Sequence, residues 1–176
     1  MSGKKLFLIA FSFVLIGVGC AKGPPPPPTP SATAEAAYVL TALNGNTAYD
    51  RAPVPTQFGC EDRLTLQRVI VPRSSRPALE TNLNTMFAVR DADAEKLGLH
   101  TPFGAQDIRA TVTQEDGKTV VDISPQPVSA GTCADPRIRK MIEETIKLST
   151  TDEVEIRVEG STKTWRCMGD MSGRCR

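Results

Sequence analysis

The chain has 176 residues, 40% of them hydrophobic, and its 21 basic and 20 acidic side chains almost cancel. This length leaves room for one domain of roughly 100–150 residues beside the terminal segments. A nearly neutral chain without a basic block is not expected to bind nucleic acid, because contacts to phosphates need clustered positive charge.

The N-terminus has the pattern of an export signal. Lys4 and Lys5 precede an apolar run over residues 6–18. A basic segment followed by about 7–15 apolar residues is typical of a secretory signal peptide. A helix that crosses a bilayer needs roughly 20 apolar residues, so this run is too short to span one.

The end of the apolar run resembles a bacterial lipobox, in which small residues precede a cysteine that receives lipid. Residues 17–20 are Gly-Val-Gly-Cys, with Gly17 where leucine is commonest. We predict that residues 1–19 are a signal peptide and that Cys20 becomes the lipid-bearing first residue, which anchors the protein to a bacterial membrane on its extracytoplasmic side. Ordinary cleavage and an uncleaved anchor are the alternatives.

A proline-rich linker is predicted over residues 20–35, with five consecutive prolines at positions 24–28. Proline fixes φ near −65° and has no N–H to donate, so such a run forms an extended polyproline helix. The position of this run, between the anchor and a folded domain, favours a spacer over a ligand for an SH3-like domain.

Residues 36–162 are predicted to form an α+β fold, with elements in the order β-β-α-β-β-α-β. We expect one mixed, mostly antiparallel sheet with both helices on one face. A loop with Pro53 and Pro55 should separate the first two strands, and Asp116-Gly117 should form a tight hairpin turn. Alternating apolar residues and helical periodicity place strands at residues 38–41 and 64–71, a helix at Ala78–Phe87, a hairpin at residues 108–123, a helix at residues 137–148 and a strand at residues 153–160.

The two predicted helices each have an apolar face and a start signal. Ser75 or a neighbour should cap the first helix, and Asp135 should cap the second. The predicted core residues are Leu83, Met86, Ile108, Val121, Ile142, Ile146, Ile156 and Val158.

The order of these elements resembles the GerMN domain, which is named from spore-germination proteins and occurs in envelope lipoproteins. The similarity covers residues 36–162 and is closest in the hairpin end at residues 120–124 and the strand at residues 154–160. This chain departs from multi-domain members by its single copy and by a cysteine-bearing tail, residues 163–176. The resemblance implies a non-enzymatic binding or scaffold domain in cell-envelope assembly or regulation, with an envelope protein or the cell wall as partner, and brings no catalytic residues.

Cysteine parity fits the lipoprotein hypothesis. If Cys20 carries lipid, four cysteines remain, and an exported chain sits in an oxidising compartment where they can form two disulfides. We predict Cys167–Cys175 within the tail and Cys60–Cys133 across the fold. The rival arrangement joins Cys133 to a tail cysteine. A metal site is disfavoured, because no pair has C-x₂-C spacing and the chain has one histidine.

Few residues suggest catalysis, and no metal or cofactor is expected. His100 lacks an accompanying Ser or Cys motif, and the acidic pairs are expected on solvated faces. Trp165 is the residue we single out for partner binding, although it could equally cover the end of the core. The alternative function is an extracytoplasmic wall-modifying hydrolase, which would need a polar cleft with convergent acid, base or nucleophile.

Overall fold

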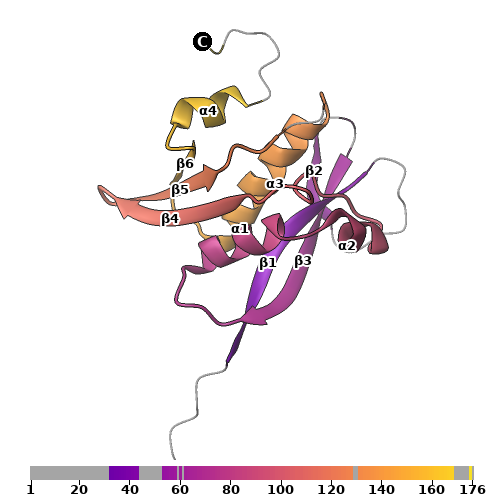
Figure 1. Ribbon diagram of the computed structural model, residues 1–176, viewed down its shortest axis with the longest axis horizontal. Helices are drawn as coiled ribbons and strands as arrows, with labels where there is room; N and C mark the ends of the chain where they lie inside the picture. Colours follow the sequence, from indigo (N-terminus) through magenta and orange to yellow (C-terminus); the bar gives the residue numbers. More distant parts are fainter. Residues whose placement is uncertain are drawn as a thin grey trace, which may run out of the picture. The chain divides into compact units, whose positions relative to one another are not determined.

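A computed structural model describes residues 32–43, 53–58, 60, 62–128, 131–168 and 175, with only the backbone of residues 53–58. The predicted signal, Cys20 and most of the linker lie outside the described residues. The elements in chain order are β1 (Thr33–Ala42), β2 (Pro53–Phe58), β3 (Asp62–Pro72), α1 (Ala78–Phe87), α2 (Asp91–Lys96), β4 (Arg109–Glu115), β5 (Lys118–Ser124), α3 (Ala134–Ser149), β6 (Val154–Val158) and α4 (Thr162–Cys167), as Figure 1 shows.

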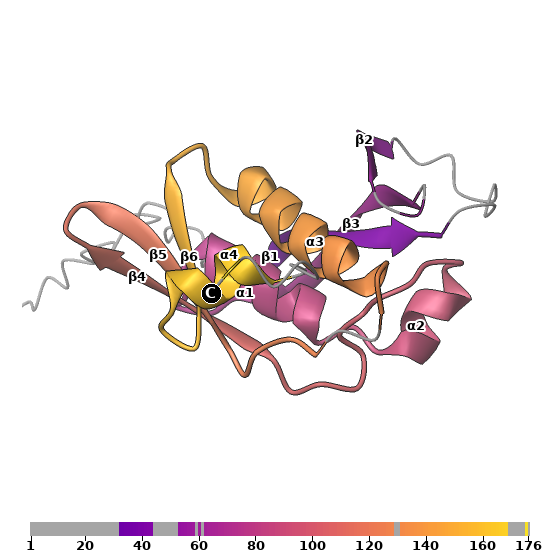
Figure 2. The same ribbon diagram turned by 90° about the horizontal axis from the view of Figure 1, so that it is seen from above.

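The α+β class and the mostly antiparallel pairing are confirmed, but the strands form two sheets where one was expected. The first sheet has the order β1-β3-β2 and the second β4-β5-β6. Only β5 and β6 pair in parallel among the described strands. Figure 2 shows the two sheets with α1 and α3 between them.

The first sheet is longer and richer in strands than the sequence pattern predicts. β1 and β3 pair continuously from Thr33 opposite Pro72 to Ala42 opposite Arg63. The segment with Pro53 and Pro55, predicted as a loop, is the strand β2. It lies at the edge of the sheet, where a residue without an N–H is tolerated because no further strand needs that donor.

The second sheet follows the prediction closely. Asp116 and Gly117 both have positive φ, 48° and 78°, as the tight turn between β4 and β5 requires. The chain then crosses through α3 to β6, which pairs in parallel with β5. A parallel neighbour needs such a crossover, since a short turn can join only antiparallel strands.

The apolar faces of α1 and α3 pack into one core that also receives residues from both sheets. Seven of the eight predicted core residues are buried; Ile156 is half-buried and packs against the core. The predicted caps are wrong. Pro77 precedes α1 and Cys133 precedes α3, neither with a side-chain cap, and Asp135 lies in the first turn of α3.

Polar side chains of α1 cover the free edge of β4. The Asn84 amide donates to the Ala110 carbonyl at 2.8 Å and accepts from the Ala110 N–H at 2.9 Å, which are the two bonds a neighbouring strand would make. A Glu80 carboxylate oxygen accepts from the Val112 N–H at 3.0 Å. These bonds satisfy backbone groups that would otherwise need another strand or water.

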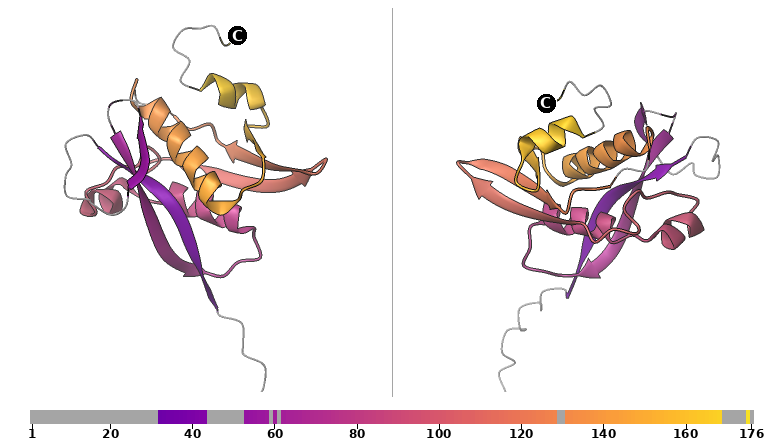
Figure 3. Two further views of the ribbon diagram at one scale, coloured as in Figure 1. Left: turned by 180° about the vertical axis from the view of Figure 1, so that it is seen from behind. Right: turned by 45° about the horizontal axis from the view of Figure 1, so that its top comes forward.

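The free edge of β1 is covered by groups from three segments. Asn82 of α1 accepts from the Ala37 N–H at 3.1 Å, and Thr145 of α3 accepts from the Val39 N–H at 3.2 Å. The backbone of His100 pairs with Thr41 in both directions. Because side chains and a loop occupy both edges, β1 and β4 do not pair with each other, and two sheets form around α1 (Figure 3).

Candidate functional site

His100, the one histidine weighed for catalysis, lies at a hollow of about 520 Å³ near the start of α3. Asp91, Thr101 and Arg137 also line this hollow. His100 is half-buried. Burial lowers the pKa of the imidazole below its ordinary value, and the nearby Arg137 guanidinium lowers it further. The neutral imidazole is therefore favoured at this position.

A buried ion pair and a disulfide join the same two segments beside this hollow. Arg137 donates to Asp62 at 2.6 Å, with 17% and 1% of their side chains exposed. Cys60, two residues before Asp62, is bonded to Cys133, four residues before Arg137, and their Cα atoms are 5.9 Å apart. The start of β3 is thus fixed to the start of α3.

The described residues around His100 do not form a catalytic arrangement. The hydrogen bonds of His100 within the described parts of the chain are those of its backbone to Thr41. Asp62 forms its buried ion pair with Arg137. Across the same parts, no three His, Cys, Asp or Glu side chains are grouped as metal ligands would be. The described lining of the hollow thus contains no assembled acid, base and nucleophile.

The described start of the tail lies in α4. Trp165, predicted for partner binding, is 7% exposed and belongs to the core, and the Arg139 guanidinium lies 5.3 Å from its ring centroid. The indole therefore packs within the domain, in agreement with the alternative that Trp165 covers the end of the core. Cys167 is bonded to Cys175, with Cα atoms 5.3 Å apart. The structure places together the same two cysteine pairs that the sequence analysis favoured over the rival pairing.

The expectation that the acidic residues lie on solvated faces is wrong for Asp62, which forms the buried ion pair with Arg137. Acidic residues on α2 and α3 form local pairs with lysines. Asp93 on α2 bonds Lys96 at 2.8 Å, which lowers the pKa of the carboxyl. On α3, Glu143 pairs with Lys140 and Glu144 with Lys147. Pairs of this kind, one helical turn apart near the surface, contribute little to stability.

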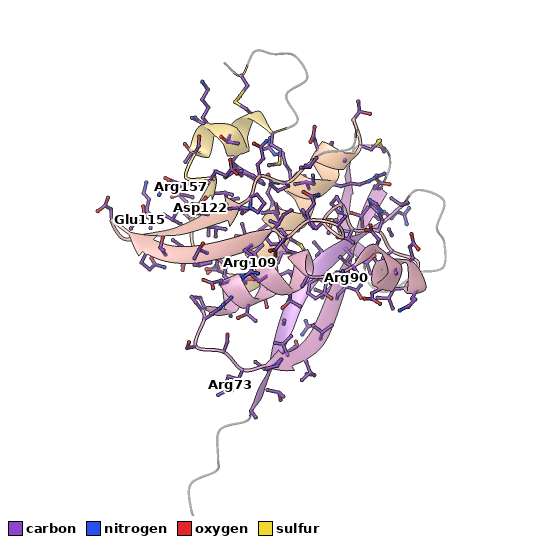
Figure 4. The ribbon with its side chains drawn as sticks, viewed as in Figure 1. Arg73, Arg90, Arg109, Glu115, Asp122 and Arg157 are labelled. Carbon is purple, nitrogen blue, oxygen red and sulfur yellow. A yellow bond between two sulfur atoms is a disulfide. The ribbon has the colours of Figure 1, made fainter. Side chains whose placement is uncertain are left out.

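A groove beside α1, which we call the arginine groove, was not predicted from the sequence. Its volume is about 520 Å³. Its lining residues are Arg76, Asn84, Phe87, Ala88, Arg90 and residues 104–109, among them Arg109. Figure 4 shows Arg90 and Arg109 beside α1. The three arginines come from three loops or element ends, so neither a charge run nor a helical stripe marked them.

The other cluster of charges labelled in Figure 4 covers the outer side of the second sheet and is internally paired. Arg157 bonds Glu115 at 2.8 Å and Glu155 at 2.7 Å, and Asp122 accepts from the Gly160 N–H. These bonds hold the pKa of Glu115 below and that of Arg157 above their ordinary values. This cluster supports the sheet and leaves little charge for a ligand.

None of the helices within the described residues is long and apolar enough to cross a membrane.

The chain was compared with protein families, curated proteins and solved structures. It matches no protein-family model and no curated protein by sequence. Among solved structures it is similar to the tandem GerMN domains of the sporulation protein GerM from Bacillus subtilis, with a TM-score of 0.50 and 15% identity. The similarity covers 74% of this chain and 40% of that one. The protein therefore has a GerMN-like fold.

Proposed function

We propose that this protein is a lipid-anchored, extracytoplasmic binding or scaffold domain without catalytic activity, acting in the assembly or regulation of a bacterial cell envelope. The observation that carries the proposal is the GerMN-like fold. The lipobox-like pattern at Cys20 and the two disulfides support an exported location, since disulfides persist in oxidising compartments.

The start of the folded domain fits a tether. β1 begins at Thr33, so 12 residues separate it from Cys20. If all 12 of these linker residues were extended at about 3.1 Å per residue, the domain could reach up to about 37 Å from the lipid. A binding domain held at this distance can contact a membrane protein or the inner layers of a wall.

Membrane fractionation of a Cys20→Ser variant tests the anchor. We expect the variant to leave the membrane fraction or to remain unprocessed, because acyl chains on Cys20 provide the membrane affinity. A Gly17→Leu variant, which restores the commonest lipobox residue, should be processed at least as well as the wild type. Normal processing and membrane retention of Cys20→Ser would contradict the anchor.

In-cell photo-crosslinking tests the binding role. A crosslinker at Thr113 on β4 and another at Ala105 in the loop before β4, both exposed, should capture an envelope protein or wall material in a domain that works by binding. The hydrolase alternative is tested by incubating the purified chain with cell walls. Release of wall fragments that His100→Ala abolishes would overturn the non-enzymatic assignment.

A further inference from the structure

We propose that the arginine groove binds an acidic segment of a partner protein through its carboxylates. The inference rests on the proposed binding function and gives that function a site and a ligand chemistry.

Two half-buried amides in the lining of the groove are bonded within the protein. Asn84 joins α1 to β4 through its two bonds with Ala110. Gln106 donates to the Pro102 carbonyl at 2.9 Å and accepts from the Val128 N–H at 2.7 Å. Since the side-chain amides that shape the groove are engaged within the protein, the groove keeps its form without a ligand and pays little ordering entropy on binding.

The three arginines at the groove form few and long ion pairs within the described protein. No carboxylate of a described residue lies within ion-pairing distance of Arg90. Arg109 meets Asp107 at 3.4 Å with 74% and 87% of the two side chains exposed, and Arg76 approaches Glu80 at 3.5 Å through Nε. By comparison, Arg157 on the second sheet forms two shorter ion pairs, at 2.7 and 2.8 Å, with two glutamates.

Three arginines around one groove specify the ligand chemistry. A guanidinium presents a planar set of N–H donors that matches a carboxylate or a phosphate with two parallel hydrogen bonds. Phe87, Ala88 and Ile108 add apolar lining between the charges. A ligand with carboxylates spaced by apolar groups therefore fits both parts of the groove.

The carboxylate on the groove argues for a peptide over a phosphate polymer. Asp107 also lines the groove, 3.4 Å from Arg109, and is largely exposed. A polymer with a charge on every unit would bring negative groups against it, whereas an acidic peptide can place an apolar or neutral residue there.

Fluorescence anisotropy with the full chain in detergent tests the proposal. The probe is a labelled peptide in which glutamate and leucine alternate, and the matched probe has glutamine for glutamate. We expect the glutamate peptide to bind the wild type and to lose about 10–100-fold in affinity with Arg76→Gln/Arg90→Gln/Arg109→Gln, as three partly exposed ion pairs would predict. Added salt should weaken binding.

A second triple variant controls for net charge. Arg63→Gln/Arg68→Gln/Arg166→Gln removes the same charge from exposed arginines outside the groove and should bind the peptide like the wild type. Equal loss in both variants, equal binding of the glutamine peptide, or no binding of the glutamate peptide would each overturn the proposal. Binding of long-chain polyphosphate, but not of the peptide, through the groove arginines would assign the site to a phosphate polymer instead. Capture of a partner by the crosslinker at Thr113 would leave the general binding role standing in all these cases.

Discussion

The free edges of β1 and β4 are covered in different ways, although both face α1. Among the described residues, the hydrogen bonds to the β4 edge come from Asn84 and Glu80 of α1. The β1 edge is shared among α1 and α3, with one bond each, and the segment at His100, with two. The difference teaches that the hydrogen bonds at the β4 edge come from one helix, whereas those at the β1 edge come from three segments, so single substitutions should affect the two edges unequally.

The largest effect is expected from a substitution that loosens both edges at once. Leu83 is fully buried on α1, between Asn82 and Asn84. Leu83→Ala removes core packing and leaves a cavity, which should lower the free energy of unfolding by about 3–5 kcal/mol. Urea denaturation measures it. A neutral result would mean that α1 does not hold the two sheets together.

The two disulfides should also differ in their effect on stability. Cys60–Cys133 joins the start of β3 in the first sheet to the start of α3, whereas Cys167–Cys175 closes a short loop after α4. Cys60 and Cys133 are 73 positions apart, and Cys167 and Cys175 are 8 apart. Paired Cys→Ser variants should lose about 4 kcal/mol for the long loop and about 2–3 kcal/mol for the short one. The loss is read from urea denaturation of each double variant against the oxidised wild type.

Mass spectrometry of non-reduced tryptic peptides checks the pairing itself. The structure predicts linked peptides that contain Cys60 with Cys133 and Cys167 with Cys175. A peptide that joins Cys133 to either tail cysteine would contradict it.

Asn84 and Asn82 provide a direct test of the two edges. Asn84→Ala leaves both the N–H and the carbonyl of Ala110 without their partners and should cost about 2–3 kcal/mol. Asn82→Ala leaves the Ala37 N–H on a strand with two other points of attachment and should cost about 1–2 kcal/mol. Hydrogen exchange should show faster opening of β4 in the first variant. Equal losses, or faster exchange in β1 in both, would remove the distinction.

Two threonines near β1 should respond in opposite ways to the same change. The buried Thr145 hydroxyl accepts from the Val39 N–H and donates to the Met86 sulfur, so Thr145→Val should cost about 1–2 kcal/mol. The Thr41 hydroxyl is fully buried and has no hydrogen-bond partner among the described residues, so Thr41→Val should be neutral or stabilising. Thermal denaturation of both variants measures the contrast, and a loss in Thr41→Val would show that its hydroxyl has a partner.

The smallest expected effect is the pH dependence due to His100 at the β1 edge. Its pKa is lowered in the folded protein by burial first and by Arg137 second, so between the folded and unfolded pKa values the unfolded chain binds more protons. Stability should therefore fall as the pH drops below about 6.5 and level off below the folded pKa. His100→Asn should reduce this loss in urea denaturation between neutral and mildly acidic pH. Identical pH profiles would contradict a lowered pKa.

Much of the fold could be predicted because the local signals agree with the tertiary structure. The helix at Ala78–Phe87 has the predicted bounds, and Asp116-Gly117 forms the predicted turn. The strand β2 could not be predicted, because its two prolines argue against a strand unless an edge position is known. The arginine groove could not be predicted either, since its residues are brought together only by the packing of α1 against β4.

The sequence by itself predicted the class of fold, most of the core and the cysteine pairs that the structure brings together, because periodicity, turn residues and cysteine parity are local or countable properties. The tertiary structure decided how the strands divide and which arginines line one groove. Asn82 and Asn84 are unremarkable polar positions on a helix in the sequence. They become the residues that separate the sheets because the chain places two strand edges, with unsatisfied backbone groups, on either side of α1.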